Sequence, residues 1–290
     1  MRARLSRVAL ETTVITHGLP RPLGLKVARE LEAEVRRHGA TPVTIGVLEG
    51  RARVGLTAAQ LDQLARAPRV LKLNLGNLAA GIAGGTPGST TVAATMLLAH
   101  RAGIRVFATG GIGGVHRGAE RSGDVSADLA ALARFPVAVV CSGAKAVLDL
   151  PKTREALETL GVPVYGFATN RFPAFYGRDS GLPVDARFDD VRALAEAVRM
   201  HFRFGSGGVV VANPVPAKDE LKAAIYEKAI GRALADAERE GVAGRDVTPF
   251  LLARLRDLTK GKSVETNRAL LVDNARLAAR LAVALAKLDH

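Results

Sequence analysis

The stretch Thr90-Thr-Val-Ala-Ala-Thr-Met-Leu-Leu-Ala-His-Arg-Ala-Gly-Ile-Arg-Val-Phe-Ala-Thr109 joins a predicted helix to a predicted strand. Residues 90–102 are rich in Ala, Leu and Met, which favours a helix. Residues 104–109 form a short apolar run, which is typical of a strand buried on both faces. A helix that leads into such a strand is the repeating unit of a parallel α/β sheet.

The same alternation covers most of the chain. Further strands are predicted over residues 8–15, 41–48, 70–75, 137–141, 162–167 and 208–212. Further helices are predicted over residues 24–38, 58–66, 126–133, 152–160 and 189–201, and then, as the only elements after residue 218, over 219–240, 249–259 and 263–288. We therefore expect an α/β fold with a mainly parallel central sheet flanked by helices (α/β/α) and a helical C-terminal part. No low-complexity linker divides the chain, so residues 1–290 are expected to form a single domain.

The composition is that of an ordinary globular protein. Apolar residues make up 48% and charged residues 24% of the 290 residues, which excludes collagen-like, disulfide-framework and disordered chains. The net charge of +13 suggests nucleic-acid binding, but the basic residues are scattered and only 4% of residues are aromatic, too few for a base-stacking surface. A solvated basic surface or a small acidic substrate such as a phosphate explains the charge better.

The sequence contains no membrane span, because polar and charged residues interrupt the nearest candidate, residues 269–286. The amino end is basic but reaches Glu11 before any long apolar region, unlike a signal peptide. The single Cys141 cannot form an internal disulfide, which fits a reducing compartment. We expect a cytoplasmic protein that does not contact membranes.

A glycine-rich run, Gly110-Gly-Ile-Gly-Gly-Val-His-Arg-Gly118, follows the strand predicted over residues 104–109. Its spacing does not give the dinucleotide fingerprint G-x-G-x-x-G. Because ligands of open α/β sheets bind at the carboxyl ends of strands, this run with His116 and Arg117 predicts a phosphate or phosphosugar site. A tight turn would explain the glycines alone equally well. Residues 84–92, which precede a predicted helix, allow the same two interpretations.

The segment Asp124-Val-Ser-Ala-Asp128 opens a predicted helix. Capping of free backbone N–H groups, at about 1 kcal/mol, explains one of its three polar side chains. At least one then remains for a cation or a sugar hydroxyl. Asp124 would suit a hard divalent ion that is held by one carboxylate and several waters.

Three charged residues stand in apolar runs. Burial of Lys145 would disfavour its ammonium form, and a neutral amine is a nucleophile for a carbonyl carbon. Snorkelling from a strand end or pairing with Asp149 is an equally good explanation. Lys72 allows the same argument more weakly. Burial of Glu11 within the first predicted strand would raise its pKa toward the range useful for acid catalysis, whereas a solvated edge strand is the competing explanation.

Several longer blocks can be considered together. They are Ala9-Leu-Glu-Thr-Thr-Val-Ile-Thr-His-Gly-Leu-Pro20, Phe107-Ala-Thr-Gly-Gly-Ile-Gly-Gly-Val-His-Arg-Gly-Ala-Glu120, Asp124-Val-Ser-Ala-Asp-Leu129, Val139-Val-Cys-Ser-Gly-Ala-Lys145, Phe172-Pro-Ala-Phe-Tyr176, Ala212-Asn-Pro214 and Thr248-Pro-Phe-Leu-Leu-Ala-Arg254. In unbroken order, from about Ala9 to Ala284, the chain resembles the pseudouridine-5'-phosphate glycosidase family, of the indigoidine synthase A type.

The resemblance implies reversible cleavage of the C–C glycosidic bond of pseudouridine 5'-phosphate to uracil and ribose 5-phosphate. It implies that Lys145 is the nucleophile, which forms a Schiff base with C1 of the ring-opened ribose, and that Glu11 is the proton donor. Asp124 matches the ligand of a manganese ion (Mn2+), and a homotrimer is implied. Substrate-binding positions are implied at Lys72, Val92, Ser126, Ala127 and Asp128, with His116 and Asn274 as further contacts to phosphate and uracil.

The chain departs from the family pattern after Lys72, where Leu73-Asn-Leu-Gly-Asn-Leu78 replaces a Ser-Arg-Arg-Asp-Leu run, and at Gly123, where an aromatic residue is usual. These changes bear on substrate affinity or subunit contacts more than on the reaction. Two alternatives stay open: another Schiff-base enzyme on phosphosugars, such as a lyase or a C-glycoside synthase, and a non-enzymatic RNA-binding protein suggested by the net charge.

Overall fold

The computed structural model describes residues 6–205, 207–242 and 247–288, without the side chains of residues 248 and 249. Residues 1–5 lie outside the described residues. They are the start of the basic amino end that was compared with a signal peptide. The described chain is built on a 10-stranded sheet with the strand order β4-β5-β2-β1-β6-β7-β10-β8-β9, and β3 pairs with β2. The strands are β1 (Arg7–Leu10), β2 (Thr41–Leu48), β3 (Arg51–Val54), β4 (Leu71–Leu73), β5 (Gly88–Thr90), β6 (Val106–Ala108), β7 (Ala138–Cys141), β8 (Val164–Phe167), β9 (Ala186–Phe188) and β10 (Val209–Ala212).

The sheet is mainly parallel, as the sequence predicts. Only the pairings of β2 with β3 and with β5 are antiparallel, and both lie toward one end of the sheet. In the centre, β1, β6, β7 and β10 run parallel, with Val8 opposite Val106 and Val139 opposite Phe107 and Val210. These central residues are fully or almost fully buried, because helices cover both faces of the sheet.

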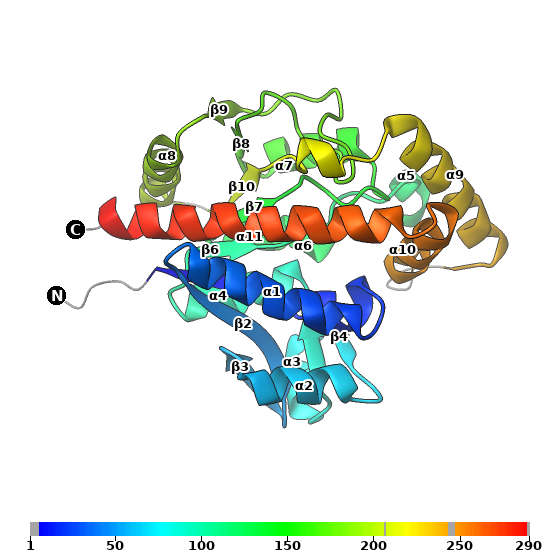
Figure 1. Cartoon of the computed structure of the whole chain (residues 1–290), viewed down its shortest axis with the longest axis horizontal. Coiled ribbons are helices and arrows are strands. Elements are labelled where there is room, and N and C mark those ends of the chain that lie inside the picture. The colour runs from blue at the N-terminus through cyan, green and yellow to red at the C-terminus, as the bar shows by residue number, and fades with distance from the viewer. Residues whose placement is uncertain (1–5, 206, 243–246, 289–290) are drawn as a thin grey trace.

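Helices form a layer on each face. On one face α11 (Lys262–Leu288) lies across the sheet between α1 (Leu23–Arg37) and α8 (Val191–Phe204), whereas α4 (Val92–Arg101) and α6 (Ala127–Arg134) pack together on the other face (Figure 1). The remaining helices are α2 (Ala58–Arg66), α3 (Leu78–Ala83), α5 (Ala119–Ser122), α7 (Leu150–Thr159), α9 (Ala223–Arg239) and α10 (Val247–Leu258). No helix in the described ranges is long and apolar enough to span a bilayer.

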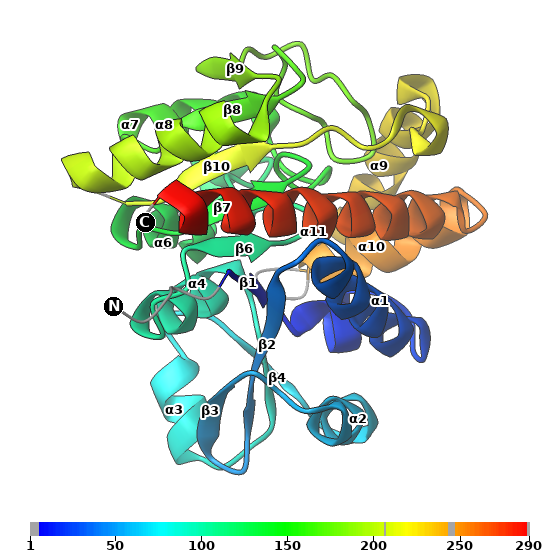
Figure 2. The ribbon, with the colours of Figure 1, turned by 60° about the vertical axis from the view of Figure 1, so that its left-hand side comes forward.

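The C-terminal part is helical, as expected. In it α9 and α10 pack against each other beside the start of α11, while α2, α3 and β3 gather near β4, at the end of the sheet opposite β9 (Figure 2). Two short turns complete the chain, a π-helical turn η1 (Val14–Gly18) and a 3-10 turn η2 (Ala217–Asp219).

Side-chain caps fix the starts of several helices. Thr57 and Gln60 form a capping box at α2, with Gln60 N donating to Thr57 Oγ1 at 3.2 Å. Ser126 caps α6, and Asp149 caps α7 by accepting a hydrogen bond from Lys152 N at 3.0 Å. Ser126 therefore takes the capping role that the sequence assigns to one residue of Asp124-Val-Ser-Ala-Asp128.

The predicted strand over residues 8–15 is wrong beyond Leu10. Glu11 lies just after β1 rather than inside it, and the chain then turns into η1. The turn forms because Thr12 uses its hydroxyl to bind other strands: Thr12 Oγ1 donates to Ile45 O at 2.8 Å and accepts from Thr90 N at 2.9 Å. The prediction also misses β3, β5, β9, α3 and α5, all of them short.

Candidate active site

Glu11 is the first residue after β1 and points to the carboxyl end of the sheet. The hydroxyls of Thr13 and Thr109 each donate a hydrogen bond to one of its carboxylate oxygens. Burial raises the pKa of Glu11 above its ordinary value of 4.5, and the positive charge of Lys145 and the two hydroxyl donors only partly oppose this effect. The solvated edge-strand explanation is therefore wrong, since β1 is a central strand.

Lys145 stands in the loop that follows β7 and is partly buried. Its backbone N donates to Ile112 O at 3.0 Å, which ties this loop to the glycine-rich run. Gly143 makes the approach possible, because its φ is +80° and a Cβ there would come within 2.1 Å of Pro173 O. Asp149 is engaged elsewhere: it caps α7, and its second oxygen lies 3.4 Å from Lys152 Nζ. The proposed pair of Lys145 with Asp149 is thus absent from the described chain.

A polar cavity of about 320 Å³ opens beside Lys145. It is lined by Lys72, Asn74, Asn77, Thr91, Gly113, His116, Asp124, Val125, Ser126, Ala127, Asp128, Lys145 and Leu148. Six residues expected from the sequence to contact substrate or metal therefore meet here, together with the expected nucleophile. They come from β4, from the loop between β6 and α5, from the loop before α6 and from α6 itself, so residues about fifty positions apart in the chain share one cavity.

The glycines of the 110–118 run serve close packing. A Cβ on Gly113 would come 2.2 Å from Ser126 Oγ, and one on Gly114 would come 2.3 Å from Thr153 Oγ1. The backbone N of Gly113 already donates to Asp128 Oδ2 at 2.8 Å. Close packing therefore accounts for Gly113 and Gly114. The ligand-site interpretation of this run stays a prediction, and it is supported by the position of Gly113 and His116 in the cavity lining.

Asp128 has a structural task, although it lines the cavity. Its side chain is buried, 3% exposed, and its two oxygens accept hydrogen bonds from the backbone N atoms of Ala93, at 2.9 Å, and Gly113. It thereby joins the amino end of α4 to the glycine-rich loop. Since Ser126 caps α6, Asp124 is the carboxylate of this segment that remains open to the cavity.

Asp124 and His116 are neighbours in the wall of this cavity. Asp124 Oδ2 lies 3.8 Å from His116 Nδ1, and the Asp124 side chain is 34% exposed. Burial, together with the charges of Lys145 and Lys72, lowers the pKa of His116, while Asp124 acts in the opposite direction. His116 is therefore mainly neutral at neutral pH.

A metal ion at this site would have few protein ligands. Within the described residues no three His, Cys, Asp or Glu side chains come close enough together to hold a metal ion. Asp124, half-open to the cavity, with His116 beside it, fits a hard ion that keeps most of its waters and uses a single carboxylate.

Two expected substrate contacts lie outside the cavity wall. Val92 is the first residue of α4 and is fully buried, and the adjacent Thr91 lines the cavity in its place. Asn274 is 0% exposed on α11, and its amide is fully hydrogen-bonded to other residues. Asn74 and Asn77, which the sequence analysis does not single out, do line the cavity. The one sequence feature that could have pointed to them is their position in the segment that departs from the family pattern.

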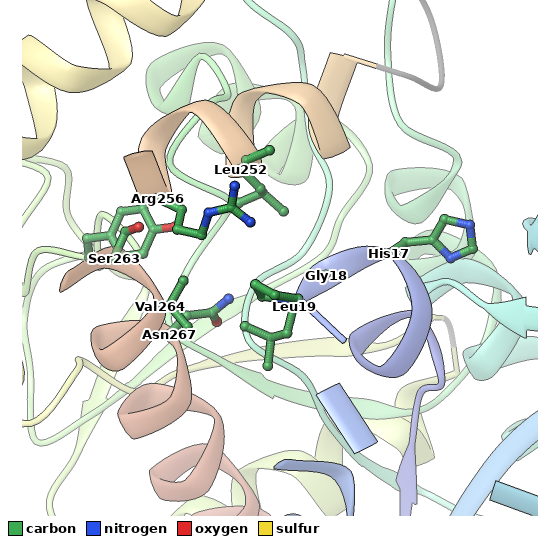
Figure 3. A pocket seen from close by; sticks show the side chains of 11 residues that line it. His17, Gly18, Leu19, Leu252, Arg256, Ser263, Val264 and Asn267 are labelled. Carbon is green, nitrogen blue, oxygen red and sulfur yellow. The ribbon is translucent and has the colours of Figure 1, made fainter. Parts of the chain in front are cut away.

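A second, smaller cavity of about 160 Å³ lies between the η1 turn, α10 and α11. In Figure 3 the guanidinium of Arg256 and the amide of Asn267 point toward Gly18 and Leu19, whereas the ring of His17 points away from them. Asn267 is only 8% exposed and its side chain has no hydrogen-bond partner among the described residues. Burial lowers the pKa of His17, and the positive charge of Lys72, which lines the first cavity, adds to this effect.

A buried carboxyl, Glu11, stands at the carboxyl end of a parallel strand and is influenced by the charge of Lys145, which lines a cavity with many polar residues. This arrangement defines an α/β protein with an enzyme-type active site. The family model described as "Indigoidine synthase A like protein" matches residues 1–284. The chain belongs to this family.

Curated relatives and solved structures agree with this membership. The chain is 57% identical over 279 residues to a pseudouridine-5'-phosphate glycosidase of Methylobacterium nodulans, covering 96% of this chain and 83% of the relative. It is 55% identical to the enzyme of the same name from Paracoccus denitrificans, covering 96% and 93%. The crystal structure of the prealnumycin C-glycosynthase AlnA in complex with ribulose 5-phosphate is similar with a TM-score of 0.90 at 39% identity, covering 97% and 92%. An indigoidine synthase A-like protein of Thermotoga maritima gives 0.89 at 37% identity, covering 98% and 93%.

Proposed function

We propose that this protein is an enzyme that reversibly cleaves the C–C glycosidic bond of pseudouridine 5'-phosphate, giving uracil and ribose 5-phosphate. The observation that carries the proposal is a buried Glu11 under the influence of the charge of Lys145, which lines a cavity with many polar residues, in a chain with 57% identity to a relative named for this activity. Neither residue would be expected at a buried strand end for packing alone.

A C-glycosidic bond offers no leaving-group oxygen to protonate, so the paired-carboxylate route of ordinary glycosidases does not apply. The Lys145 amine instead adds to C1 as the bond from C1 to the ring oxygen breaks, and the released oxygen takes up the proton that the amine gives up. The nitrogen lone pair then forms the Schiff base to C1 while the bond from C1 to C5 of uracil breaks. Glu11 supplies the proton that C5 of uracil needs as it leaves, and its raised pKa suits that task. Water then releases ribose 5-phosphate from Lys145.

The first cavity suits the phosphosugar half of the substrate. Lys72 and Lys145 bring positive charge to it, and Asn74, Asn77, Thr91 and Ser126 bring hydrogen-bonding side chains or backbone. We propose that Asp124 holds a manganese ion there, which would stabilise negative charge on the substrate while keeping water in its coordination shell.

The second cavity suits the uracil half. Asn267 aims into it an amide that has no hydrogen-bond partner among the described residues, and an amide can pair with the alternating N–H and C=O groups of a uracil edge. Asn267 also lies beside the strand end that carries Thr109, since a Cβ on Gly110 would be 3.4 Å from Asn267 Oδ1. We therefore assign base recognition to Asn267 rather than to Asn274.

A homotrimer and a cytoplasmic location complete the proposal, the first from the family resemblance and the second from the unpaired Cys141. The Cys141 thiol is buried, and burial raises its pKa to about 12, so it is unreactive toward thiol oxidants. Sedimentation velocity of the purified protein tests the trimer, and fractionation of cells tests the location.

The decisive experiment measures uracil release from pseudouridine 5'-phosphate, with and without manganese. In parallel, ribose 5-phosphate and borohydride should reduce the imine onto Lys145, which peptide mass spectrometry locates. Lys145→Arg should lose both reactions, while Lys152→Arg, at an exposed lysine paired with Glu120, should keep both. An active enzyme with an unmodified Lys145 would exclude the Schiff base.

A second candidate function is C–C bond formation between a phosphosugar and another ring system, because AlnA, a C-glycosynthase, shares the fold at 39% identity. Incubation of ribose 5-phosphate with uracil and with competing heterocycles separates the two. Exclusive coupling to a heterocycle other than uracil would favour the synthase.

A further inference from the structure

Asn274 joins the ends of three neighbouring strands. Its Nδ2 donates to Thr109 O at 2.9 Å and to Ser142 Oγ at 3.2 Å, and its Oδ1 accepts from Asn213 Nδ2 at 3.0 Å. Thr109, Ser142 and Asn213 are the first residues after β6, β7 and β10, which are adjacent in the sheet. We call these four residues the strand-end clamp.

The orientation of the Asn274 amide is fixed by its partners. A carbonyl oxygen such as that of Thr109 can only accept, so the nitrogen of Asn274 must face it. The oxygen then faces Asn213, whose Nδ2 also donates to Asp273 Oδ2 at 2.9 Å. Asp273 in turn accepts from Arg276 Nη1 at 2.8 Å, which ties the clamp to charged groups at the surface of α11.

The clamp reaches the reacting groups through Thr109. The backbone oxygen of Thr109 is held by Asn274, while its hydroxyl donates to the Glu11 carboxylate. A small shift at the end of β6 would therefore remove one of the two hydroxyl donors of Glu11, leaving only Thr13. An apolar residue at position 274 would fill the space, but it would take away the side-chain donor to the oxygen of Thr109 and leave Asn213 Nδ2 with Asp273 alone as acceptor.

We propose that Asn274 is a positioning residue, which holds Thr109 in place against the Glu11 carboxyl. The inference rests on the proposed function, because it concerns the proton donor of that reaction. It gives Asn274 a task that its complete burial permits, whereas a direct contact with substrate would require the amide to abandon its partners.

The test compares kcat and KM for uracil release, and borohydride trapping at Lys145, in purified full-length variants. Asn274→Asp keeps the shape but loses the donor to Thr109, and Thr109→Val loses the hydroxyl. We expect each to lower kcat about tenfold, the effect of one lost hydrogen bond near the top of its usual range, with KM within about twofold. The double variant should be no slower than the slower single variant, because both act on the same contact. Trapping at Lys145 should persist.

Three further variants separate positioning from simple loss of structure. Thr109→Ser restores the hydroxyl and should recover most of the wild-type kcat. Asn274→Ser, which adds no buried charge, replaces Asn274→Asp if that variant does not fold. Thr266→Val removes another α11 hydrogen bond, which is partly buried and runs from Thr266 Oγ1 to Asp219 O at 2.8 Å, and should lower the melting temperature without changing kcat.

Multiplicative losses in the double variant, or a raised KM at unchanged kcat, would overturn the inference, since they would indicate independent action or direct substrate contact. A kcat for Thr266→Val as low as that for Asn274→Asp would overturn it too. A wild-type protein that releases no uracil would refute the proposed function, and the inference with it. An active wild-type enzyme with an unaffected Asn274→Asp would refute the inference alone.

Discussion

The positive charge of Lys145 acts on the carboxyl of Glu11, although the two residues follow β7 and β1, which β6 separates in the sheet. Burial raises the pKa of Glu11 and the lysine charge lowers it, with burial the larger effect. Parallel strands make such a meeting possible, because their carboxyl ends lie on one edge whatever their order along the chain. Opposing influences of this kind decide how readily a buried carboxyl takes up and releases a proton.

Glu11→Gln should separate the two chemical tasks. Glutamine keeps the shape and can still bind Thr13 and Thr109, but it cannot donate an acidic proton. Loss of a general acid typically lowers the rate by about 10²–10⁴-fold, and we expect that fall in uracil release. Borohydride trapping of ribose 5-phosphate at Lys145 should continue, because imine formation uses the lysine. Loss of trapping together with release would mean that Glu11 also activates Lys145.

The same variant predicts a pH-dependent change in stability. A carboxyl whose folded-state pKa is raised above 4.5 binds its proton more tightly when folded, so its effect on stability becomes unfavourable as pH rises from about 4.5 through the folded-state pKa. Glu11→Gln removes this loss of stability at higher pH. Its melting temperature should exceed that of the wild type at pH 8, by about 2–4 °C for each kcal/mol, and the difference should shrink toward pH 4.

Glu158→Gln, at an exposed position on α7, is the matched control for this comparison and should melt like the wild type at both pH values. Calorimetry or circular dichroism gives the melting temperatures. If Glu11→Gln were less stable than the wild type at pH 8, the burial of Glu11 would not dominate its ionisation.

Asp128→Ala should damage stability more than an ordinary cap variant. It would leave the buried N–H groups of Ala93 and Gly113 without partners, at a cost on the order of 3 kcal/mol. Asp190→Ala removes an exposed cap, in which Asp190 accepts from Ala193 N at 2.9 Å, and should cost about 1 kcal/mol. Urea denaturation measures both. Equal losses would show that Asp128 acts only as a helix cap.

The sequence predicts the central sheet well because its strands are continuous apolar runs. Residues 41–48 and 58–66 are predicted with the observed limits of β2 and α2. The missed strands lack that signal: β3 reads Arg-Ala-Arg-Val and β5 reads Gly-Ser-Thr. Each forms because a neighbouring strand offers backbone hydrogen bonds, which is a tertiary effect that the local sequence does not contain.

Site residues can be predicted where a charged residue interrupts an apolar run, as Glu11 and Lys145 do. It is not predictable where two similar residues share a helix. Asn267 and Asn274 are seven residues apart on α11 and so lie on nearly the same face. Only the neighbours of each residue, a cavity for Asn267 and three strand ends for Asn274, distinguish them. Asp128 likewise reads as an open carboxylate until its two backbone partners are seen.

Asp124→Ala tests the proposed metal site. Because Asp124 is the only carboxylate of its segment left open to the cavity, its loss should weaken manganese binding by more than the 10–100-fold typical of an outer-shell partner. A titration in which electron paramagnetic resonance measures the free Mn2+ gives the Kd. Asp189→Ala, at a surface aspartate paired with Arg187, is the control and should bind like the wild type. Unchanged manganese binding by Asp124→Ala would show that the ion binds at another site.

Asn267→Ala tests the assignment of uracil to the second cavity. In the direction of synthesis, the variant should raise the KM for uracil about tenfold, as expected for the loss of one or two neutral hydrogen bonds. The KM for ribose 5-phosphate and trapping at Lys145 should stay within about twofold, because the first cavity is the one proposed for the phosphosugar. Initial rates with each substrate varied in turn measure both constants. A raised KM for ribose 5-phosphate with an unchanged KM for uracil would indicate instead that the second cavity binds the phosphosugar and the first binds uracil.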